Sequence, residues 1–253
     1  MKRFRLLLFL IVMAHFSTVN SYSQITADEA LSKFVAAGMA YQDGQYVTAI
    51  ARYREILDGG RESGAVYYNL GNSYFHNKEI GKALLNYERA KRLIPRDSDL
   101  NYNYRYVRAR ADNYSDENES FFSRAVINFV QFYTVDEMTL MIAGLIFAIG
   151  MVFLLFQWMG WSRSFHRGII ALLVLILAIY AVGLNIKIRL NKDCAIVVMA
   201  GESYFEPRTD STMHFKLPEG MQVEILKSEG NWVKIQRLDG KVGWTSRDVL
   251  EEI

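Results

Sequence analysis

The chain has few cysteines and histidines and a small net charge, and each of these features excludes a class of function. The sequence has one cysteine, Cys194, so no disulfide can form within the chain, and a cysteine-rich zinc or iron–sulfur site is excluded. The four histidines lie far apart along the sequence, so we expect no metal site, and no pattern indicates a bound cofactor. A formal net charge of +2 provides no basic field of the kind that nucleic-acid-binding proteins need, so we expect no nucleic acid partner.

Charged residues are also missing from two long stretches, residues 138–162 and 168–186. A helix over residues 138–159 would reach roughly 33 Å, about the thickness of the hydrocarbon core of a bilayer. A helix over residues 168–190 would cross a second time, with Lys187 close to its end. Because the interiors of both spans lack ionisable residues, we expect an anchor in the lipid bilayer rather than a transport path. The sequence therefore predicts a transmembrane hairpin of two helices.

Residues 1–23 have the pattern of a secretory signal peptide, with a basic start, a short apolar run and small polar residues at the end. The apolar run is too short to span a bilayer, although an uncleaved N-terminal anchor is an alternative. Between the two spans, the loop over residues 160–167 carries Arg163 and Arg167 without an acidic residue, which predicts that the loop is cytoplasmic. We therefore expect both soluble domains on the exported side, although basic residues also follow the second span.

An internal repeat lies between the leader and the first span. Ala49 and Ala83 are separated by about 34 residues, as are Tyr53 and Tyr87, and this is the period of the tetratricopeptide repeat. The second copy resembles that repeat at Tyr67, Leu70, Gly71, Tyr74, Ala83, Tyr87, Ala90 and Pro95. Small residues such as Gly71 and the two alanines let antiparallel helices approach closely, and the tyrosines fill the gaps between them.

The repeats define the boundaries of the predicted N-terminal domain. The first repeat covers residues 30–63 and the second covers residues 64–97, where Pro95 stops the last helix. Residues 98–112 have the composition of one more helix, which we interpret as the capping helix that a stack of repeats requires. The resemblance implies an all-α tetratricopeptide solenoid over residues 24–113.

In the tetratricopeptide family, the first helix of each repeat lines a groove that receives an extended peptide or a partner helix. Carried onto the second repeat, the groove positions are Tyr68, Asn69, Asn72, Phe75 and His76. Asparagine amides in such a groove could bond both donors and acceptors of a peptide backbone. The alternative is that Asn69 and Asn72 only tie adjacent helices together.

Basic residues gather on the second helix of the second repeat and just after it. They are Arg89, Lys91, Arg92 and Arg96. The acidic residues Glu88, Asp97 and Asp99 balance them, so we expect a solvated helix face rather than a binding site.

The region between the repeats and the first span, residues 114–137, combines a polar linker with an amphipathic segment. Apolar residues recur at helical spacing over residues 121–133, while Arg124, Asn128 and Gln131 share the opposite face. One interpretation is a helix that lies along the membrane surface. The other is a last helix that packs on the preceding domain.

The C-terminal residues 191–253 change from helical to strand-like patterning. Short apolar runs alternate with tight-turn signals, among which Asp239-Gly240 is a strong two-residue hairpin turn. Several short strands within about 60 residues predict a small closed barrel.

This segment resembles the bacterial SH3-type domain. The matching positions are Gly220, Trp232, Gly243, Trp244 and the terminal residues 250–253. We interpret Trp232 and Trp244 chiefly as packing residues of the core or rim, with a ligand-facing role as the lesser alternative. A groove for proline-rich peptides needs an array of exposed aromatic residues. Only Tyr204 and Phe205 are left to form one, so we do not expect such a groove.

The predicted fold is a multidomain membrane protein: an all-α solenoid, a transmembrane hairpin and a small all-β SH3-type barrel. This order resembles the BatE-like proteins of the Bacteroides aerotolerance (Bat) operon. The resemblance implies a non-enzymatic scaffold of the bacterial inner membrane with both soluble domains in the periplasm. Its implied partners are membrane proteins of the same operon, including von Willebrand factor A-type proteins, in aerotolerance or envelope stress. The alternative is a membrane anchor or sensor whose SH3-type domain binds peptidoglycan. No acid–base, nucleophile or metal set points to an enzyme.

Overall fold

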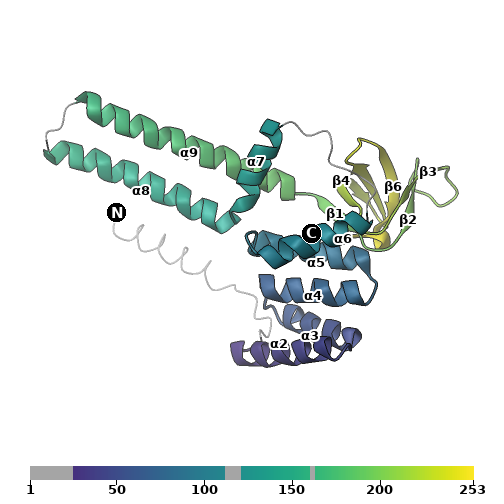
Figure 1. Ribbon diagram of the computed structural model, residues 1–253. Coiled ribbons are helices and arrows are strands. Elements are labelled where there is room, and N and C mark those ends of the chain that lie inside the picture. Colours follow the sequence, from purple (N-terminus) through teal and green to yellow (C-terminus); the bar gives the residue numbers. More distant parts are fainter. Residues whose placement is uncertain (1–24, 112–120, 160–162) are drawn as a thin grey trace, which may run out of the picture. The chain divides into compact units, whose positions relative to one another are not determined.

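The computed structural model of the protein describes residues 25–111, 121–159 and 163–253. The predicted signal peptide, residues 1–23, lies outside these described residues, as do residues 114–120 of the predicted linker. The chain divides into two compact units between Glu62 and Ser63. Figure 1 shows that helices form the N-terminal and middle parts of the chain and that strands form its C-terminal part.

The first unit contains a pair of helices. Their bounds are Ala27–Gln42 for α2 and Tyr46–Asp58 for α3. Thr26 caps α2, because its side-chain oxygen accepts a hydrogen bond from the main-chain N–H of Glu29 at 3.1 Å. Tyr53 of α3 is buried, and the ring of Phe34 from α2 meets it edge-on at 5.6 Å between centroids. This aromatic contact helps to hold the two helices of the pair together.

The second unit begins with three helices. Their bounds are Gly64–His76 for α4, Ile80–Leu93 for α5 and Ser98–Ala111 for α6. Gly71 allows α4 and α5 to cross closely, since a Cβ atom there would lie 2.7 Å from ring carbons of Tyr87. Ala83 and Tyr87 are buried, and α5 ends shortly before Pro95. The predicted helical N-terminal region is thus confirmed, whereas the stacking of its helix pairs into a solenoid stays a prediction.

Two apolar helices follow and run side by side in Figure 1. Their bounds are Val135–Met159 for α8 and Arg163–Asn191 for α9. Segments Val135–Phe156 and Arg167–Asn191 are each long and apolar enough to cross a membrane, which agrees with the two predicted spans. The helix α9 begins earlier than the span predicted from residue 168. Residues 163–167, predicted as loop, form its first turn, because they contain neither proline nor glycine to delay the helix.

The amphipathic segment forms helix α7, Phe121–Phe132, which packs against α9. The ring of Phe129 meets that of Tyr180 edge-on, with 5.8 Å between centroids. The ammonium group of Lys187 donates a hydrogen bond to the main-chain oxygen of Val130 at 3.1 Å. The apolar face of α7 is therefore turned toward the second apolar helix.

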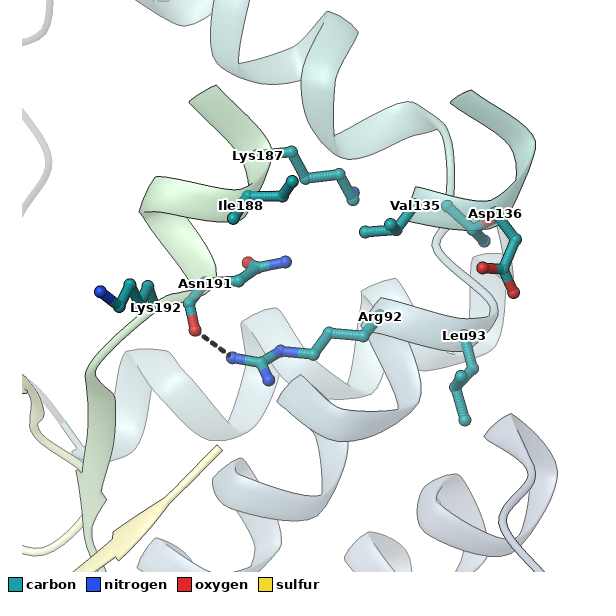
Figure 2. A pocket seen from close by; sticks show the side chains of 9 residues that line it. Arg92, Leu93, Val135, Asp136, Lys187, Ile188, Asn191 and Lys192 are labelled. Carbon is teal, nitrogen blue, oxygen red and sulfur yellow. Dashed lines mark hydrogen bonds between the residues drawn. The ribbon is translucent and has the colours of Figure 1, made fainter. Parts of the chain in front are cut away.

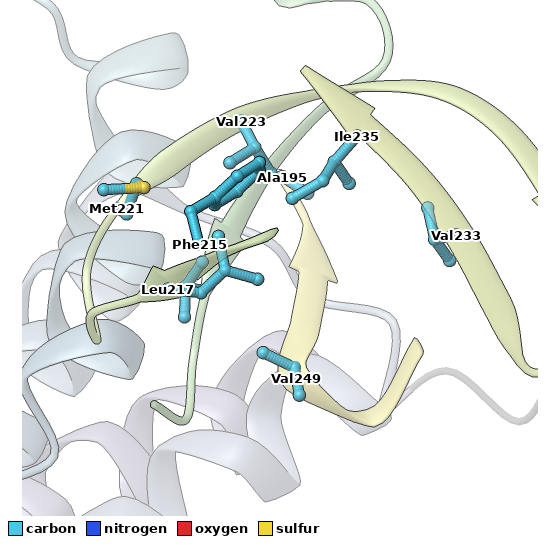
Figure 3. Close-up of a cluster of buried hydrophobic side chains, with 9 residues drawn as sticks. Ala195, Phe215, Leu217, Met221, Val223, Val233, Ile235 and Val249 are labelled. Atoms are coloured by element: carbon cyan, nitrogen blue, oxygen red, sulfur yellow. The ribbon is translucent and has the colours of Figure 1, made fainter. Parts of the chain in front are cut away.

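The C-terminal residues form one antiparallel sheet of seven strands, with the order β3-β2-β6-β5-β4-β1-β7. The strands are β1 Cys194–Val197, β2 Gly201–Tyr204, β3 Met213–Leu217, β4 Gln222–Glu229, β5 Trp232–Arg237, β6 Val242–Ser246 and β7 Leu250–Glu252. A single 3-10 turn, Arg247–Val249, joins β6 to β7. Figure 3 shows the apolar core side chains of this sheet pointing into the space between its curved strands.

The prediction of a closed barrel is wrong, because the sheet has two free edges. Strand β3 pairs only with β2, and β7 pairs only with β1. Within the described sheet, no hydrogen-bonded ladder joins these two edge strands to each other, and side-chain packing fills the space near them. A Cβ atom at Gly201 of β2 would lie 2.8 Å from a methyl carbon of Val249, so the 3-10 turn presses directly on the main chain there. The result is an SH3-like sheet that encloses a core without closing.

Helix α5 packs against one end of this sheet. The main-chain N–H of Gly81 donates to the carboxylate of Glu219 at 2.8 Å. Arg89 donates to the main-chain oxygen of Glu252 at 2.7 Å and forms an ion pair with Glu251 at 3.0 Å. The helices α4–α6 and the sheet therefore form one packed body within the second unit.

Candidate functional site

The alternation of side chains along β5 and β6 separates a core face from an outer face. Val233 and Ile235 of β5 point into the core, so Trp232 and Lys234 point outward. In the register of these strands, Lys234 lies opposite Trp244 of β6. Both tryptophans therefore lie on the outer face of the sheet, outside the apolar core cluster.

Strand β2 adds a third aromatic residue to the outer face. Tyr204 is the cross-strand partner of Trp244, and its ring meets that of Trp232 at 5.9 Å with an interplanar angle of 87°. The ammonium group of Lys234 lies 5.9 Å from the centre of the Trp244 ring, within the range of a cation–π contact. We call Tyr204, Trp232 and Trp244 the aromatic face.

Exposure differs among the three rings. Trp244 is 9% exposed, whereas Trp232 and Tyr204 are half-buried and so present part of each ring to solvent. Trp244 is buried, as the prediction of a packing role implies, although neither tryptophan belongs to the apolar cluster between the strands. Trp232 and Tyr204 are therefore the two members of the face that a ligand could touch.

An acidic side chain lies next to the aromatic face. The Tyr204 hydroxyl donates to the Glu202 carboxylate at 2.9 Å, and this hydrogen bond raises the pKa of Tyr204 above its ordinary value. Glu202 is exposed, so it keeps acceptor capacity for a further partner. The site thus combines flat apolar rings with one carboxylate, a combination suited to a ligand with an apolar part and a cationic or hydrogen-bond-donating group.

Phe205, the other exposed aromatic residue that the sequence offers, does not join the aromatic face. Its ring is 58% exposed and lies against His214, with 4.2 Å between ring centres. The two signature glycines serve packing. A Cβ atom at Gly243 would lie 3.2 Å from the core ring of Phe215, and one at Gly220 would lie 2.7 Å from Leu84 of α5.

The predicted groove residues on α4 are held by bonds within the helical bundle. The Asn72 side-chain oxygen accepts from the Tyr87 hydroxyl at 2.6 Å and from the Asn103 amide at 3.1 Å. The same Asn103 amide donates to the Tyr68 hydroxyl at 2.9 Å. The Asn69 amide donates to the main-chain oxygen of Ala65 at 3.0 Å, one turn earlier in its own helix. The bonds of Asn72 favour the interpretation in which that residue ties adjacent helices together, whereas the bond of Asn69 stays within α4.

The remaining two groove candidates lie at the end of α4. The Phe75 ring meets the ring of Tyr106 from α6 edge-on at 6.0 Å between centroids, and that of His76 at 5.5 Å. His76 is exposed, as is Tyr106. The structure thus groups Tyr68 and Asn72 in a network, and places Phe75 between His76 and Tyr106.

Metal binding and thiol chemistry are two further activities that a site could support. Over the described ranges, no group of three or more His, Cys, Asp or Glu side chains is arranged to hold a metal ion. Burial raises the pKa of the Cys194 thiol above its ordinary value, which disfavours the nucleophilic thiolate form.

The period-two pattern of residues 232–236 could have revealed the outward position of Trp232 before the structure, since Val233 and Ile235 fill the other face. The approach of Tyr204 could not have been found in that way, because it depends on how β2 pairs with β6.

Comparison with known proteins gives one family match. The family described as "Bacterial SH3 domain" matches residues 204–251, a range that contains all three residues of the aromatic face. No curated protein matches the chain. The C-terminal sheet is therefore similar to a bacterial SH3 domain, which is a module for binding peptidoglycan or proteins.

Proposed function

We propose that this protein is a non-enzymatic, membrane-anchored adaptor whose aromatic face binds an extended peptide segment of a partner protein. The observation that carries the proposal is the convergence of Tyr204, Trp232 and Trp244 on the outer surface of the SH3-like sheet. Our expectation of no groove for proline-rich peptides counted only Tyr204 and Phe205 as available rings, whereas Trp232 joins Tyr204 on this face. Flat aromatic rings bind extended, proline-containing peptides without a large loss of conformational entropy. Glu202 at the edge of the face would select a peptide with a basic residue next to its apolar part.

The anchor in this proposal is the hairpin of α8 and α9. Almost none of the residues in the most apolar stretches of α8 and α9 are buried by other parts of the protein, 0% and 6% respectively. Lipid would therefore surround both helices. Large apolar side chains such as Leu140, Phe147 and Leu154 are 68–72% exposed. With the basic segment between the spans on the cytoplasmic side, both soluble parts would lie in the periplasm of a bacterial inner membrane.

The tetratricopeptide-like helices would provide a second contact with partners. A Bat-type complex, with von Willebrand factor A-type membrane proteins of the same operon, is the proposed setting, and tolerance of oxygen or envelope stress is the proposed role. Support for this setting comes from the order of helical repeats, apolar hairpin and SH3-like sheet.

A second candidate function is the binding of peptidoglycan. Aromatic rings such as Trp232 can also stack on sugar rings, and the matched family accommodates this function. One set of variants separates the two candidates, because the same full-length protein can be offered both ligands.

The test compares the full-length chain with its Trp232→Ala variant. Binding would be measured to a panel of proline-containing peptides with a basic residue, and separately to purified peptidoglycan. Removing an aromatic anchor at a binding site typically costs about 2 kcal/mol or more, so we expect peptide affinity to fall by more than about tenfold. The matched control is Tyr102→Ala, which removes a 65% exposed aromatic ring on α6.

The outcomes discriminate clearly. Loss of peptide binding in the Trp232 variant alone supports the adaptor. Loss of peptidoglycan binding in that variant, with no peptide bound by the unaltered chain, assigns the face to the cell wall. If Trp232→Ala, Tyr102→Ala and the unaltered chain bind peptide or peptidoglycan equally well, the aromatic face has no role in that binding.

A further inference from the structure

Two cavities lie beside the ends of the apolar helices, between α5, α7, α8 and α9. The larger has a volume of about 560 Å³ and the smaller about 310 Å³. Arg92, Lys187 and Asn191 line both of them. Figure 2 shows the side chains of these three residues extending into the same opening, while Asp136 and Lys192 lie at opposite sides of it. We call this opening, with its two cavities, the basic pocket.

The charges that line the basic pocket are mostly positive. The cationic side chains are Lys91, Arg92, Lys187 and Lys192, and the anionic ones are Glu88 and Asp136. Among the described residues, no side-chain carboxylate lies within 4.0 Å of the charged nitrogen atoms of Arg92 or Lys187. Within the described ranges, the two innermost cations of the pocket therefore have no Asp or Glu side chain as an ion-pair partner, and Arg92 instead donates to an oxygen atom of Ile253.

Both cations keep hydrogen-bond donors for another group. Lys187 is 5% exposed and donates once, to the main-chain oxygen of Val130. Arg92 is half-buried and donates to the main-chain oxygens of Ile253 and Asn191, at 2.6 and 3.0 Å. An ammonium group has three N–H donors and a guanidinium group five, so each retains unused donors. Burial lowers the pKa of Arg92, and an anion in the pocket would oppose this effect.

The basic pocket lies where the two apolar segments end. Val135 is the first residue of one segment and Asn191 the last of the other, and both line the larger cavity. Three apolar residues, Leu93, Val135 and Ile188, also line the larger cavity. In a bilayer this level is occupied by lipid headgroups and the first carbons of the acyl chains, and basic pockets between membrane helices bind anionic headgroups.

We propose that the basic pocket binds a phosphate group, supplied by the headgroup of an anionic phospholipid, with Arg92 and Lys187 as its ligands. The inference rests on the membrane anchoring proposed above and is independent of the aromatic face. The planar guanidinium of Arg92 suits the paired oxygen atoms of a phosphate, and Lys187 supplies a second charge from the opposite helix. The apolar lining would contact the glycerol backbone and upper acyl chain of the same lipid.

The experiment uses the full-length protein in phosphatidylcholine nanodiscs that contain a minority of phosphatidylglycerol. After release into detergent, native mass spectrometry counts the lipid that each variant retains. The variants are Arg92→Gln and Lys187→Met, each with a conservative partner that keeps the charge, Arg92→Lys and Lys187→Arg. The matched control is Lys216→Gln, which removes an exposed charge on β3, far along the chain from the pocket. Phosphatidylcholine discs with inorganic phosphate in the buffer form a separate arm.

The proposal predicts selective retention of phosphatidylglycerol by the unaltered chain and by Lys216→Gln. Loss of one charged hydrogen-bond donor should lower this retention by about tenfold in Arg92→Gln and Lys187→Met, and the charge-conserving variants should recover most of it. Equal retention by all variants would overturn the proposal. Binding of inorganic phosphate without retained phosphatidylglycerol would overturn the lipid as its source.

Resistance of the protein to carbonate extraction from membranes is measured in parallel. A chain that is extracted by carbonate would refute both the anchor and the lipid site. A chain that resists extraction but retains no anionic lipid would refute the lipid site alone.

Discussion

Replacement of Gly71 by alanine tests how closely α4 and α5 must approach. The added Cβ atom would lie 2.7 Å from two ring carbons of Tyr87 and 3.2 Å from the main-chain oxygen of Ala83. Tyr87 cannot turn aside freely, because it is 1% exposed and its hydroxyl donates to Asn72 at 2.6 Å. Either the ring moves and its hydrogen bond is lost, or the two helices separate.

Two opposing effects decide the sign of the change. Alanine is favoured over glycine within a helix by about 1 kcal/mol. Overpacking of a tight contact costs about 1–3 kcal/mol, and loss of the Tyr87 hydrogen bond adds about 1 kcal/mol. The net result is a destabilisation of about 1–3 kcal/mol. The control is Gly38→Ala in α2, where the nearest atom would be the Tyr53 hydroxyl at an ordinary 3.8 Å. There the helix preference acts alone and alanine should stabilise.

Hydrogen exchange followed by mass spectrometry measures both effects in the full-length protein, because it reports the opening of each segment separately. In Gly71→Ala, amides of residues 64–93 should exchange about 5- to 140-fold faster, since a factor of ten corresponds to about 1.4 kcal/mol. In Gly38→Ala, residues 27–42 should exchange at the same rate or more slowly. Unchanged or slower exchange over residues 64–93 in Gly71→Ala would refute the close crossing of α4 and α5.

Two further predictions concern side-chain networks. Tyr104 is buried, its hydroxyl donates to Glu88 and accepts from Arg108, and burial raises its pKa well above the ordinary value. Tyr104→Phe should therefore destabilise α5 and α6 by about 1–3 kcal/mol in the same exchange experiment, whereas Tyr102→Phe on the exposed face should have no effect, and equal effects would contradict this. The hydrogen bond from Lys33 lowers the pKa of Glu55, so its contribution is present above the ordinary carboxyl pKa and is lost as the pH falls through the lowered value. In an NMR titration, Lys33→Met should raise the pKa of Glu55 toward its ordinary value, and an unchanged pKa would show that the ion pair is not formed.

The helices could be predicted because their signals are local. Gly71 and Ala83 mark positions where helices approach, and Tyr87 marks the gap to be filled, all at the spacing of one repeat. The two apolar helices follow from uninterrupted stretches without charge. In each case the information lies within one element and its neighbour, which is the range over which periodicity is informative.

The aromatic face depends on contacts that the sequence does not show. That Trp232 serves packing at the core or rim stays a prediction, and the alternation of its strand places it opposite the core residues Val233 and Ile235. The predicted closure of the sheet rests on the number of short strands alone. Which strands become edges depends on pairing between distant segments, and turn signals within the sequence do not determine it.

Arg92 shows the limit of reasoning from sequence neighbours. The charge balance around it predicts a solvated helix face, because Glu88 and Asp97 are close in the sequence. In the structure Arg92 is half-buried instead, and its acceptors are Asn191 and Ile253, which are 99 and 161 residues away. Contacts between residues so far apart in the sequence place Arg92 in the lining of the basic pocket.

The same contacts bear on the topology of the chain. Arg92 lies before the hairpin of α8 and α9, whereas Asn191 and Ile253 lie at its end and beyond it. A hairpin that crosses a bilayer twice brings both sides of these bonds into one compartment, while a single crossing would separate them by the full hydrocarbon core. The ion pair between Arg89 and Glu251 also requires the residues before and after the hairpin to lie in one compartment. The contacts of α5 are therefore compatible with two crossings and incompatible with one, and protection of only one soluble part from protease in sealed vesicles would contradict all three contacts.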